Sequence, residues 1–232
     1  LYAVLQAIAS PEKNILTIED PVEYELDGVG QIHVNAKIGL TFAEGLRSIV
    51  RQDPDVILIG EIRDTETASI AVQSSLTGHL VFSTLHTNDA PSAVTRLFDM
   101  RVEPFLLASV LRAVIAQRLV RLLCPHCRIP YTPSEAELQE LGPARQAYAG
   151  QSLYRSGGCD ACMGTGFRGR IAIYEVLPVQ EDLRRRIADQ ADADALRAIA
   201  LQGGMRSLHY DGCLKAIAGL TTLTEVIRVT SV

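Results

Sequence analysis

The chain has 232 residues, of which 47% are hydrophobic and 21% are charged, and its formal net charge is −5. This composition is that of a globular protein with a sizeable buried core, and it differs from that expected of an intrinsically disordered chain. The acidic balance argues against a dedicated nucleic-acid-binding protein, because such proteins carry a surplus of basic residues.

The first 123 residues predict an alternation of strands and helices. Apolar runs bounded by turn residues predict strands, and segments with helical periodicity and capping residues predict helices. The expected strands are 14–18, 29–34, 56–59 and 80–85, and the expected helices are 1–9, 41–51, 65–76, 89–100 and 103–123. Thr41 and Glu44 predict a capping box at the start of the second helix. Alternation of this kind indicates a three-layer α/β core with a mostly parallel sheet.

The composition changes after residue 123. The segment that follows contains four of the five cysteines and many Gly and Pro residues. One polar helix is expected at 133–141, a strand at 170–177, and further helices at 181–188, 193–201, 205–218 and 222–229. We therefore expect an α/β core in residues 1–123, a cysteine-containing element in residues 124–170 and a C-terminal helical subdomain in residues 171–232.

The sequence carries no signal for a membrane span or a secretory leader. The most apolar stretch, residues 105–123, is interrupted by arginines and a glutamine, so it falls short of the roughly 20 apolar residues that a span needs. The opening Leu-Tyr-Ala-Val-Leu has no basic leader region. Cysteines in Cys-x-x-Cys pairs are more typical of metal thiolates in a reducing compartment than of disulfides. These features predict a cytoplasmic protein.

The clustered cysteines form two Cys-x-x-Cys pairs, Cys124 with Cys127 and Cys159 with Cys162. Each pair can give two thiolates to one tetrahedral ion, and four thiolates close the coordination sphere, as in structural zinc sites. Glycines around the second pair suit the tight turns of such knuckles. Disulfides are the alternative, and His126 is an alternative ligand, but the spacing favours four sulfurs around one Zn²⁺.

Ionisable side chains gather at the ends of three expected strands. Glu19 and Glu61 follow the first and third strands, and His79 and His86 flank the fourth. Parallel sheets of α/β enzymes carry their chemistry at the carboxyl ends of strands. Nucleotide hydrolysis needs a partner for Mg²⁺, an acceptor that orients water and donors to the γ-phosphate. We predict Glu61 as the metal partner, Glu19 as the base and the histidines as phosphate contacts, although the residues leave open which glutamate is which.

Two arginines extend this set of candidates. Arg47 and Arg51 lie four residues apart on one face of an expected helix and can donate to phosphate. Each candidate also has a structural alternative, because strand-end acids often cap helices or form turns, and paired arginines can form a solvated helix face. The occurrence of ionisable groups at three strand ends of one sheet favours the catalytic interpretation.

Three long motifs strongly resemble those of the secretion-ATPase superfamily, specifically the type II secretion and type IV pilus assembly ATPases. Residues 17–23, Thr-Ile-Glu-Asp-Pro-Val-Glu, are similar to the family's Asp box. Residues 51–64, which end in Ile-Leu-Ile-Gly-Glu-Ile-Arg-Asp, resemble its Walker B motif, and residues 77–88, Thr-Gly-His-Leu-Val-Phe-Ser-Thr-Leu-His-Thr-Asn, resemble its His box. The likeness continues through the cysteines and residues 169–177 into residues 219–222. The tetracysteine element is common in the secretion branch of the family and absent from its pilus retraction branch.

The resemblance implies a RecA-like core that uses ATP with Mg²⁺, a homo-hexameric ring and a location at the cytoplasmic face of the inner membrane. The implied partners are the membrane platform and adaptor proteins of a secretion or pilus system, with no nucleic acid. It implies Glu19 as the general base, Glu61 as the Walker B carboxylate, and His79 and His86 close to the γ-phosphate.

The phosphate-binding loop G-x-x-x-x-G-K-[ST] does not occur in the 232 residues. In the family this loop immediately precedes a segment like residues 1–5. Its backbone amides and its lysine hold the phosphates. We therefore expect residues 1–232 alone to bind nucleotide weakly and to show no appreciable hydrolysis.

Two other interpretations stay open at this point. Residues 159–166 follow the pattern Cys-x-x-Cys-x-Gly-x-Gly and resemble one zinc-knuckle repeat of the heat-shock co-chaperones, which would make the chain a binding module. The other interpretation is a nucleic-acid motor of the same ATPase superfamily. The acidic balance disfavours that motor, whereas DNA binding with a steep salt dependence would support it.

Overall fold

The computed structural model describes residues 1–231, which form two compact units. The first unit comprises residues 1–87, 93–112 and 180–193, and the second comprises residues 88–92, 113–179 and 194 onward. The division into three consecutive parts at residues 123 and 170 stays a prediction.

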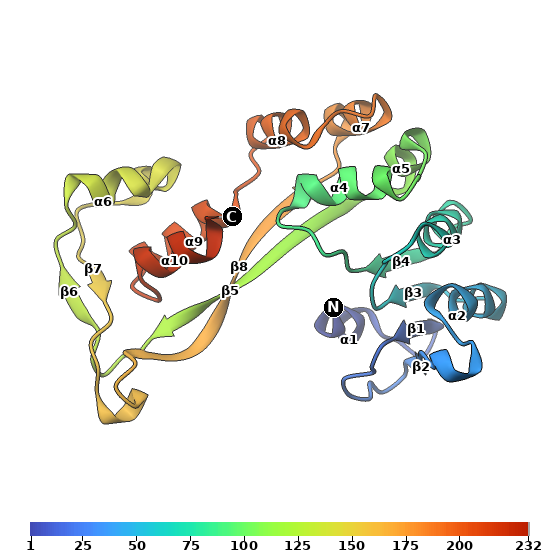
Figure 1. Cartoon of the computed structure of the whole chain (residues 1–232), viewed down its shortest axis with the longest axis horizontal. Helices are drawn as coiled ribbons and strands as arrows, with labels where there is room; N and C mark the ends of the chain where they lie inside the picture. The colour runs from blue at the N-terminus through green and yellow to red at the C-terminus, as the bar shows by residue number, and fades with distance from the viewer. Residues whose placement is uncertain (232) are drawn as a thin grey trace. The chain divides into compact units, whose positions relative to one another are not determined.

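A parallel sheet forms the centre of the first unit (Figure 1). Its strands are β1 (Ile15–Glu19), β2 (Gly30–His33), β3 (Val56–Ile59) and β4 (Leu80–Ser83), in the order β2-β1-β3-β4. The register aligns Ile18 with Ile32 of β2 and with Ile59 of β3. The carboxyl ends of these strands therefore lie level, and the segments that follow them meet at one edge of the sheet.

Helices cover both faces of this sheet. The helices on these faces are α1 (Tyr2–Ile8), α2 (Phe42–Ile49) and α3 (Thr65–Leu76). Outside them, α5 (Pro104–Val110) packs against α3, and α7 (Glu181–Ala188) packs against α5. Short 3-10 turns lie at Ala36–Ile38 and Val50–Gln52. Leu5 of α1 packs in one cluster with Ile15 and Leu58. Ile18 points to the opposite face, since side chains alternate along a strand, and there it lies against Gly45 of α2. The three-layer α/β core predicted from the sequence is confirmed.

Side-chain caps explain where two of these helices begin. Asp64 Oδ1 accepts the amide of Thr67 at 2.8 Å and starts α3. Thr41 Oγ1 accepts the amide of Glu44 at 3.2 Å and starts α2. The predicted capping box at α2 is half formed, because the carboxylate of Glu44 pairs with Arg47 at 2.9 Å instead of turning back to the backbone of Thr41.

A long antiparallel ribbon of β5 (Ala113–Leu123) and β8 (Phe167–Pro178) organises the second unit (Figure 1). Its other elements are the pair β6 (Ile129–Tyr131) and β7 (Leu153–Arg155), the helices α6 (Glu135–Glu140), α9 (Leu208–Ile217) and α10 (Leu223–Thr230), most of α8 (Ala193–Gln202), and 3-10 turns at Gly142–Ala147 and Asp160–Cys162. The helix α4 (Ala90–Asp99) has residues in both units. Leu141, Cys213 and Val226 lie at the centre of a core cluster in the second unit.

The helix predicted over 103–123 is wrong in its second half. Glu103 does begin a helix, but α5 ends at Val110, and the chain then runs as the strand β5. Backbone pairing explains the difference: β5 is held along nearly its whole length by β8, a segment about 50 residues away in the sequence. An apolar run interrupted by arginines fits either a helix or a strand, and this distant pairing selects the strand.

Candidate functional site

Glu19 and Glu61 meet at the carboxyl edge of the parallel sheet. Glu19 is the last residue of β1, and Glu61 follows β3 after a single glycine, Gly60. The Gly60 amide donates to the Ile18 carbonyl at 2.8 Å. A Cβ added to Gly60 would stand 3.3 Å from Glu19 Cα, so glycine permits the close approach of the two strand ends. The expectation that the two acids share one edge is confirmed.

The Glu61 carboxylate contacts two side chains, the guanidinium of Arg63 and the imidazole of His86. Arg63 donates Nε to Oε2 and Nη2 to Oε1, both at 2.5 Å, and His86 Nε2 lies 3.0 Å from Oε2. A carboxylate only accepts, so this contact requires the proton on His86 Nε2. The Arg63 guanidinium, and to a smaller extent His86, hold the pKa of the Glu61 carboxyl below its ordinary value, although burial acts in the opposite direction. Glu61 is therefore an anion able to face Mg²⁺.

Glu19 is buried and contacts only neutral groups. Its residue is 4% exposed. Oε1 accepts from the Thr17 hydroxyl at 2.5 Å and from Gln31 Nε2 at 3.1 Å, and Oε2 accepts from the Tyr2 hydroxyl. Within residues 1–231, no Lys, Arg or His donates to this carboxylate. The two strand-end acids thus stand side by side in different electrostatic surroundings.

The two predicted histidines lie at opposite ends of β4. His86 follows this strand and reaches Glu61. His79 precedes it, next to Leu80, which pairs with the first residue of β3, so His79 lies at the amino edge of the sheet. There its Nδ1 is 2.8 Å from the Ser74 carbonyl oxygen and 3.1 Å from the Thr77 hydroxyl. The structure therefore brings His86, but not His79, to Glu61.

The two predicted arginines are engaged in local contacts on the α2 side of the sheet. Arg47 pairs with Glu44 at 2.9 Å and also contacts Glu66 at the start of α3. Arg51 lies in the 3-10 turn after α2, where its Nη2 is 3.5 Å from the Ser48 hydroxyl. Their predicted role in phosphate binding stays a prediction.

The four cysteines of the two knuckles come together in the second unit as a candidate metal centre. The sulfur atoms of Cys124 and Cys159 are 3.9 Å apart, and those of Cys162 lie 3.8 Å from both Cys127 and Cys159. All four lie within 4.8 Å of one another. A tetrahedron of sulfurs with metal–sulfur bonds of about 2.3 Å has edges of about 3.8 Å. The cluster therefore has the size that a tetrahedral thiolate site requires.

The alternatives to a four-sulfur site are not seen in the structure. The cysteines within residues 1–231 are free thiols, and a disulfide would require sulfurs about 2.05 Å apart. The metal-ligand cluster consists of the four cysteines without His126. The amides of Cys159 and Gly166 point at Cys162 Sγ at 3.4 and 3.1 Å, and together with the neighbouring thiols they lower the pKa of the Cys162 thiol. Such amides favour the thiolate that binds a metal. Burial and the neighbouring cysteines raise the pKa of the Cys127 thiol instead.

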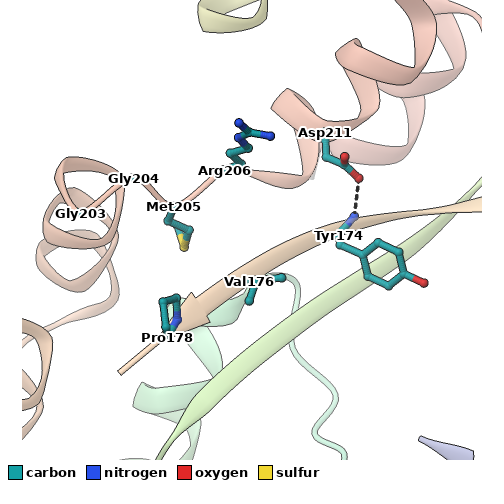
Figure 2. Close-up of a pocket in the computed structure, with 8 residues that line it drawn as sticks. All are labelled: Tyr174, Val176, Pro178, Gly203, Gly204, Met205, Arg206 and Asp211. Carbon is teal, nitrogen blue, oxygen red and sulfur yellow. Dashed lines mark hydrogen bonds between the residues drawn. The ribbon is translucent and has the colours of Figure 1, made fainter. Parts of the chain in front are cut away.

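The second unit also contains an open pocket of about 350 Å³. Figure 2 shows that it lies between β8 and the segment that joins α8 to α9. Asp211 closes one end, where its Oδ2 accepts the Tyr174 amide at 2.9 Å. The lining residues are Tyr174, Val176, Pro178, Gly203, Gly204, Met205, Arg206 and Asp211. None of the residues predicted to act in catalysis or metal binding lines it.

Comparison with known sequences agrees with this geometry. The profile of the family described as "Type II/IV secretion system protein" matches residues 1–228. The chain belongs to this family. It is 53% identical over 230 residues to the type II secretion system protein E of Dickeya dadantii and 49% identical over 229 residues to the type IV pilus assembly ATPase PilB of Thermus thermophilus. Both alignments cover 99% of this chain, but the chain spans only 45% and 26% of the two relatives.

Solved structures share the fold of this chain. The pilus retraction motor PilT with bound ADP superposes with a TM-score of 0.69 at 26% sequence identity, and the match covers 98% of this chain and 55% of PilT. The ATPase DotB of Legionella pneumophila has the same fold, with a TM-score of 0.66 at 21% identity and coverage of 98% and 55%. The core of this chain is therefore RecA-like, as the motifs implied.

Several residues of the site were not predicted from the sequence. Arg63 could have been predicted from the sequence, because it stands two residues after Glu61 in an extended segment, where both side chains point to one side. Tyr2 and Gln31 could not have been predicted, since they reach Glu19 from other elements. In the part of the chain that the structure describes, no helix has the length and hydrophobicity that a bilayer span requires.

Proposed function

We propose that this chain is part of an ATP-hydrolysing motor subunit that powers pseudopilus assembly in type II protein secretion or pilus assembly in type IV pilus biogenesis. The observation that carries the proposal is the pair Glu19 and Glu61 at the carboxyl ends of neighbouring parallel strands, in a chain of the secretion family. The relatives named as a secretion protein E and as a pilus assembly ATPase support both branches of the proposal.

The residues divide the chemistry between them. In the proposed reaction Glu61 faces Mg²⁺ bound to the nucleotide, and Arg63 and His86 keep this carboxylate ionised. His86 is largely exposed at the edge of the sheet while it contacts Glu61, so its ring is accessible to the γ-phosphate of a bound nucleotide. Glu19 orients or deprotonates the attacking water. The ion supplies charge stabilisation for the transferring phosphoryl group when it is bound.

The proposed assembly is a homo-hexamer at the cytoplasmic face of the inner membrane, docked to the platform and adaptor proteins of the secretion or pilus system. Family membership is the support for this assembly. ATP is the substrate, and no nucleic acid takes part. The net charge of −5 is consistent with a motor that moves protein subunits.

We further propose that the ion held by Cys124, Cys127, Cys159 and Cys162 is a structural Zn²⁺. Four thiolates leave no open position for water or substrate, and three sulfur–sulfur distances of 3.8–3.9 Å fit this ion. Elemental analysis of the purified protein is the test, and we expect one zinc per chain. Protein that contains no zinc while its thiols are intact would rule out this proposal.

The catalytic proposal is tested with Glu61→Gln in the full-length protein. This change keeps the shape of the side chain but removes its charge, so we expect ATP turnover to fall about 10²–10⁴-fold while nucleotide binding persists. Phosphate release measures turnover, and a fluorescent nucleotide measures binding. Glu103→Gln is the matched control, because Glu103 is exposed in the same unit and makes no side-chain cap. Near-normal turnover by Glu61→Gln would show that Glu61 is structural.

A magnesium titration assigns the two glutamates. If Glu61 is the metal partner, raising the Mg²⁺ concentration should partly restore turnover in Glu61→Gln but not in Glu19→Gln. Rescue by Mg²⁺ in Glu19→Gln but not in Glu61→Gln would make Glu19 the metal partner and Glu61 the base. ATP turnover by the unsubstituted protein that depends on added DNA would instead support a nucleic-acid motor.

A further inference from the structure

The carboxylate of Glu19 is held by three donors that come from three different elements of the first unit. Tyr2 lies on α1, Thr17 on β1 and Gln31 on β2. Thr17 and Gln31 both donate to Oε1, at 2.5 and 3.1 Å, and Tyr2 donates to Oε2. With a donor on each oxygen, the carboxylate cannot rotate without losing hydrogen bonds, so its orientation is defined.

These donors are themselves fixed by the segment that follows β1. The Tyr2 hydroxyl accepts the amide of Glu23 at 3.2 Å, and its ring packs edge-on against Tyr24 with centroids 4.7 Å apart. Gln31 Oε1 accepts the amide of Leu26 at 2.8 Å. The amide oxygen of Gln31 is therefore committed to the backbone, which points its NH₂ group at Glu19 and settles which way the side chain faces.

The character of the donors matters for the chemistry. A buried carboxylate needs hydrogen bonds to offset its desolvation, and these can come from charged or from neutral donors. The donors to the Glu19 carboxylate are two hydroxyls and an amide, so they hold it without placing a positive charge beside it. Glu61, on the neighbouring strand, has Arg63 instead. Glu19 therefore has neutral donors and Glu61 has a cationic one, as in enzyme sites where two carboxylates perform different steps.

We propose that Tyr2, Thr17 and Gln31 are positioning residues that hold the Glu19 carboxylate in the orientation required for ATP hydrolysis. This inference rests on the proposed function, in which Glu19 acts on the attacking water. It adds a specific consequence: α1, which carries Tyr2, is connected through one hydroxyl to the acid at the end of β1. A change in α1 is thereby transmitted to the Glu19 carboxylate.

The test uses isosteric changes in the full-length protein. Tyr2→Phe and Thr17→Val each remove one hydroxyl and keep the volume of the side chain. One lost hydrogen bond to a charged group corresponds to about a tenfold effect, so we expect kcat to fall about tenfold in each variant. The KM for ATP should stay within about twofold, because these side chains donate to Glu19 and are not among the proposed nucleotide contacts. Thr17→Ser restores the hydroxyl and should recover most of the lost kcat.

Two controls separate positioning from a purely structural role. Tyr148→Phe makes the same chemical change at a partly buried tyrosine of the second unit and should leave kcat unchanged. In the Glu19→Gln background, Tyr2→Phe should have little further effect on kcat, because the group that it positions is already lost. Independent, multiplicative losses in the double variant would overturn the inference.

The outcomes also distinguish this inference from the proposed function. If Glu61→Gln and Glu19→Gln lose turnover while Tyr2→Phe and Thr17→Val keep the parental kcat, the positioning role is wrong and the motor function stands. If Glu19→Gln hydrolyses ATP normally, both the role of Glu19 and the inference fail. A fall in melting temperature with unchanged kcat in Tyr2→Phe and Thr17→Val would identify the network as structural only.

Discussion

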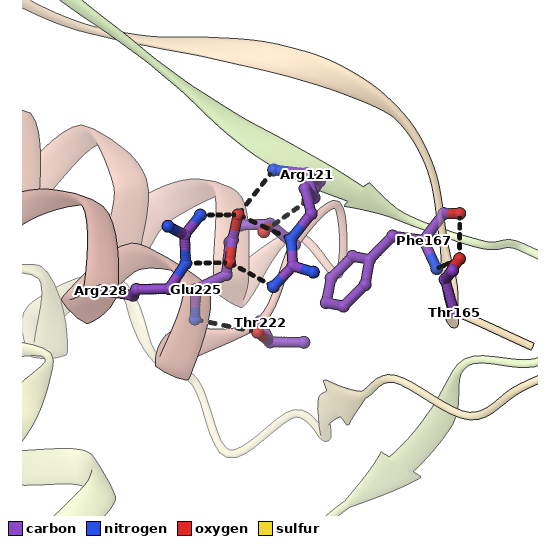
Figure 3. Close-up of polar contacts among 7 residues, drawn as sticks. Arg121, Thr165, Phe167, Thr222, Glu225 and Arg228 are labelled. Carbon is purple, nitrogen blue, oxygen red and sulfur yellow. Dashed lines mark hydrogen bonds and ion pairs between the residues drawn. The ribbon is translucent and has the colours of Figure 1, made fainter.

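Glu225 joins α10 to the β5 strand of the second unit, and its removal gives a quantitative prediction. The side chain is 1% exposed and accepts five hydrogen bonds: from the amide, Nε and Nη2 of Arg121 at 3.1, 3.0 and 2.7 Å, and from Nε and Nη2 of Arg228 at 2.9 and 2.7 Å. Figure 3 shows the carboxylate between the two guanidinium groups, with Arg121 also lying over the ring of Phe167. We expect Glu225→Gln to loosen this junction.

The size of the effect follows from the pKa of Glu225. Burial raises the pKa of this carboxyl, but Arg228 and Arg121 outweigh it and lower the pKa from 4.5 to about 2. At about 1.4 kcal/mol per pH unit, this difference corresponds to about 3 kcal/mol at neutral pH. Both guanidinium groups are half exposed, and solvent screening reduces the value. We therefore expect Glu225→Gln to lower the free energy of unfolding by about 1.5–3 kcal/mol at pH 7.

The same shift predicts how the effect depends on pH. The pKa of Glu225 is lower in the folded state than in the unfolded state, so its stabilisation is complete above pH 4.5 and is lost as the pH falls towards 2. The difference between the parent and Glu225→Gln should therefore narrow by about 1–2 kcal/mol between pH 7 and pH 3. The comparison with the variant at each pH cancels the other groups that titrate in this range, including the metal-binding thiols.

Urea unfolding followed by far-ultraviolet circular dichroism measures this difference, since urea does not screen ion pairs. Glu181→Gln is the matched control: Glu181 also pairs with two arginines, Arg184 and Arg185, but its side chain is 61% exposed. We expect that control to lose less than about 0.5 kcal/mol. Equal losses in the two variants, or a loss in Glu225→Gln that does not change with pH, would refute the reasoning.

Two further predictions concern the metal centre and the core helices. Gly157→Ala should abolish stoichiometric metal binding, because a Cβ there would collide with the carbonyl oxygen of Cys127; elemental analysis of the purified variant checks this, and a full metal complement would contradict it. Asp64→Ala should destabilise the first unit by about 1 kcal/mol, since it removes the cap that accepts the Thr67 amide. Asp64→Asn, which keeps a capping oxygen, should retain most of that stability in urea unfolding.

Local patterns were enough to predict most of the first unit. β3 at 56–59 and α3 at 65–76 have the predicted bounds, because a continuous apolar run and a capped periodic segment each carry their own signal. The four cysteines were also predicted to come together, because each Cys-x-x-Cys pair can give two thiolates to one tetrahedral ion. In these cases the residues that define the feature lie close together in the chain.

Other features depend on partners that are distant in the sequence. The β5 strand was predicted as helix, and pairing with β8 decides its conformation. Both His79 and His86 were predicted as phosphate contacts, but they lie at opposite ends of β4 and therefore at opposite edges of the sheet.

The sequence by itself therefore determined the family, the parallel α/β core, the strand-end acids Glu19 and Glu61, and the four-sulfur cluster. Only the tertiary structure decided what surrounds each acid. Tyr2 and Gln31 reach Glu19 from α1 and β2, whereas Glu61 has a guanidinium from its own segment. The physical reason is that the charge state and orientation of a carboxylate depend on donors within about 3 Å in space, and separation along the chain does not reveal them.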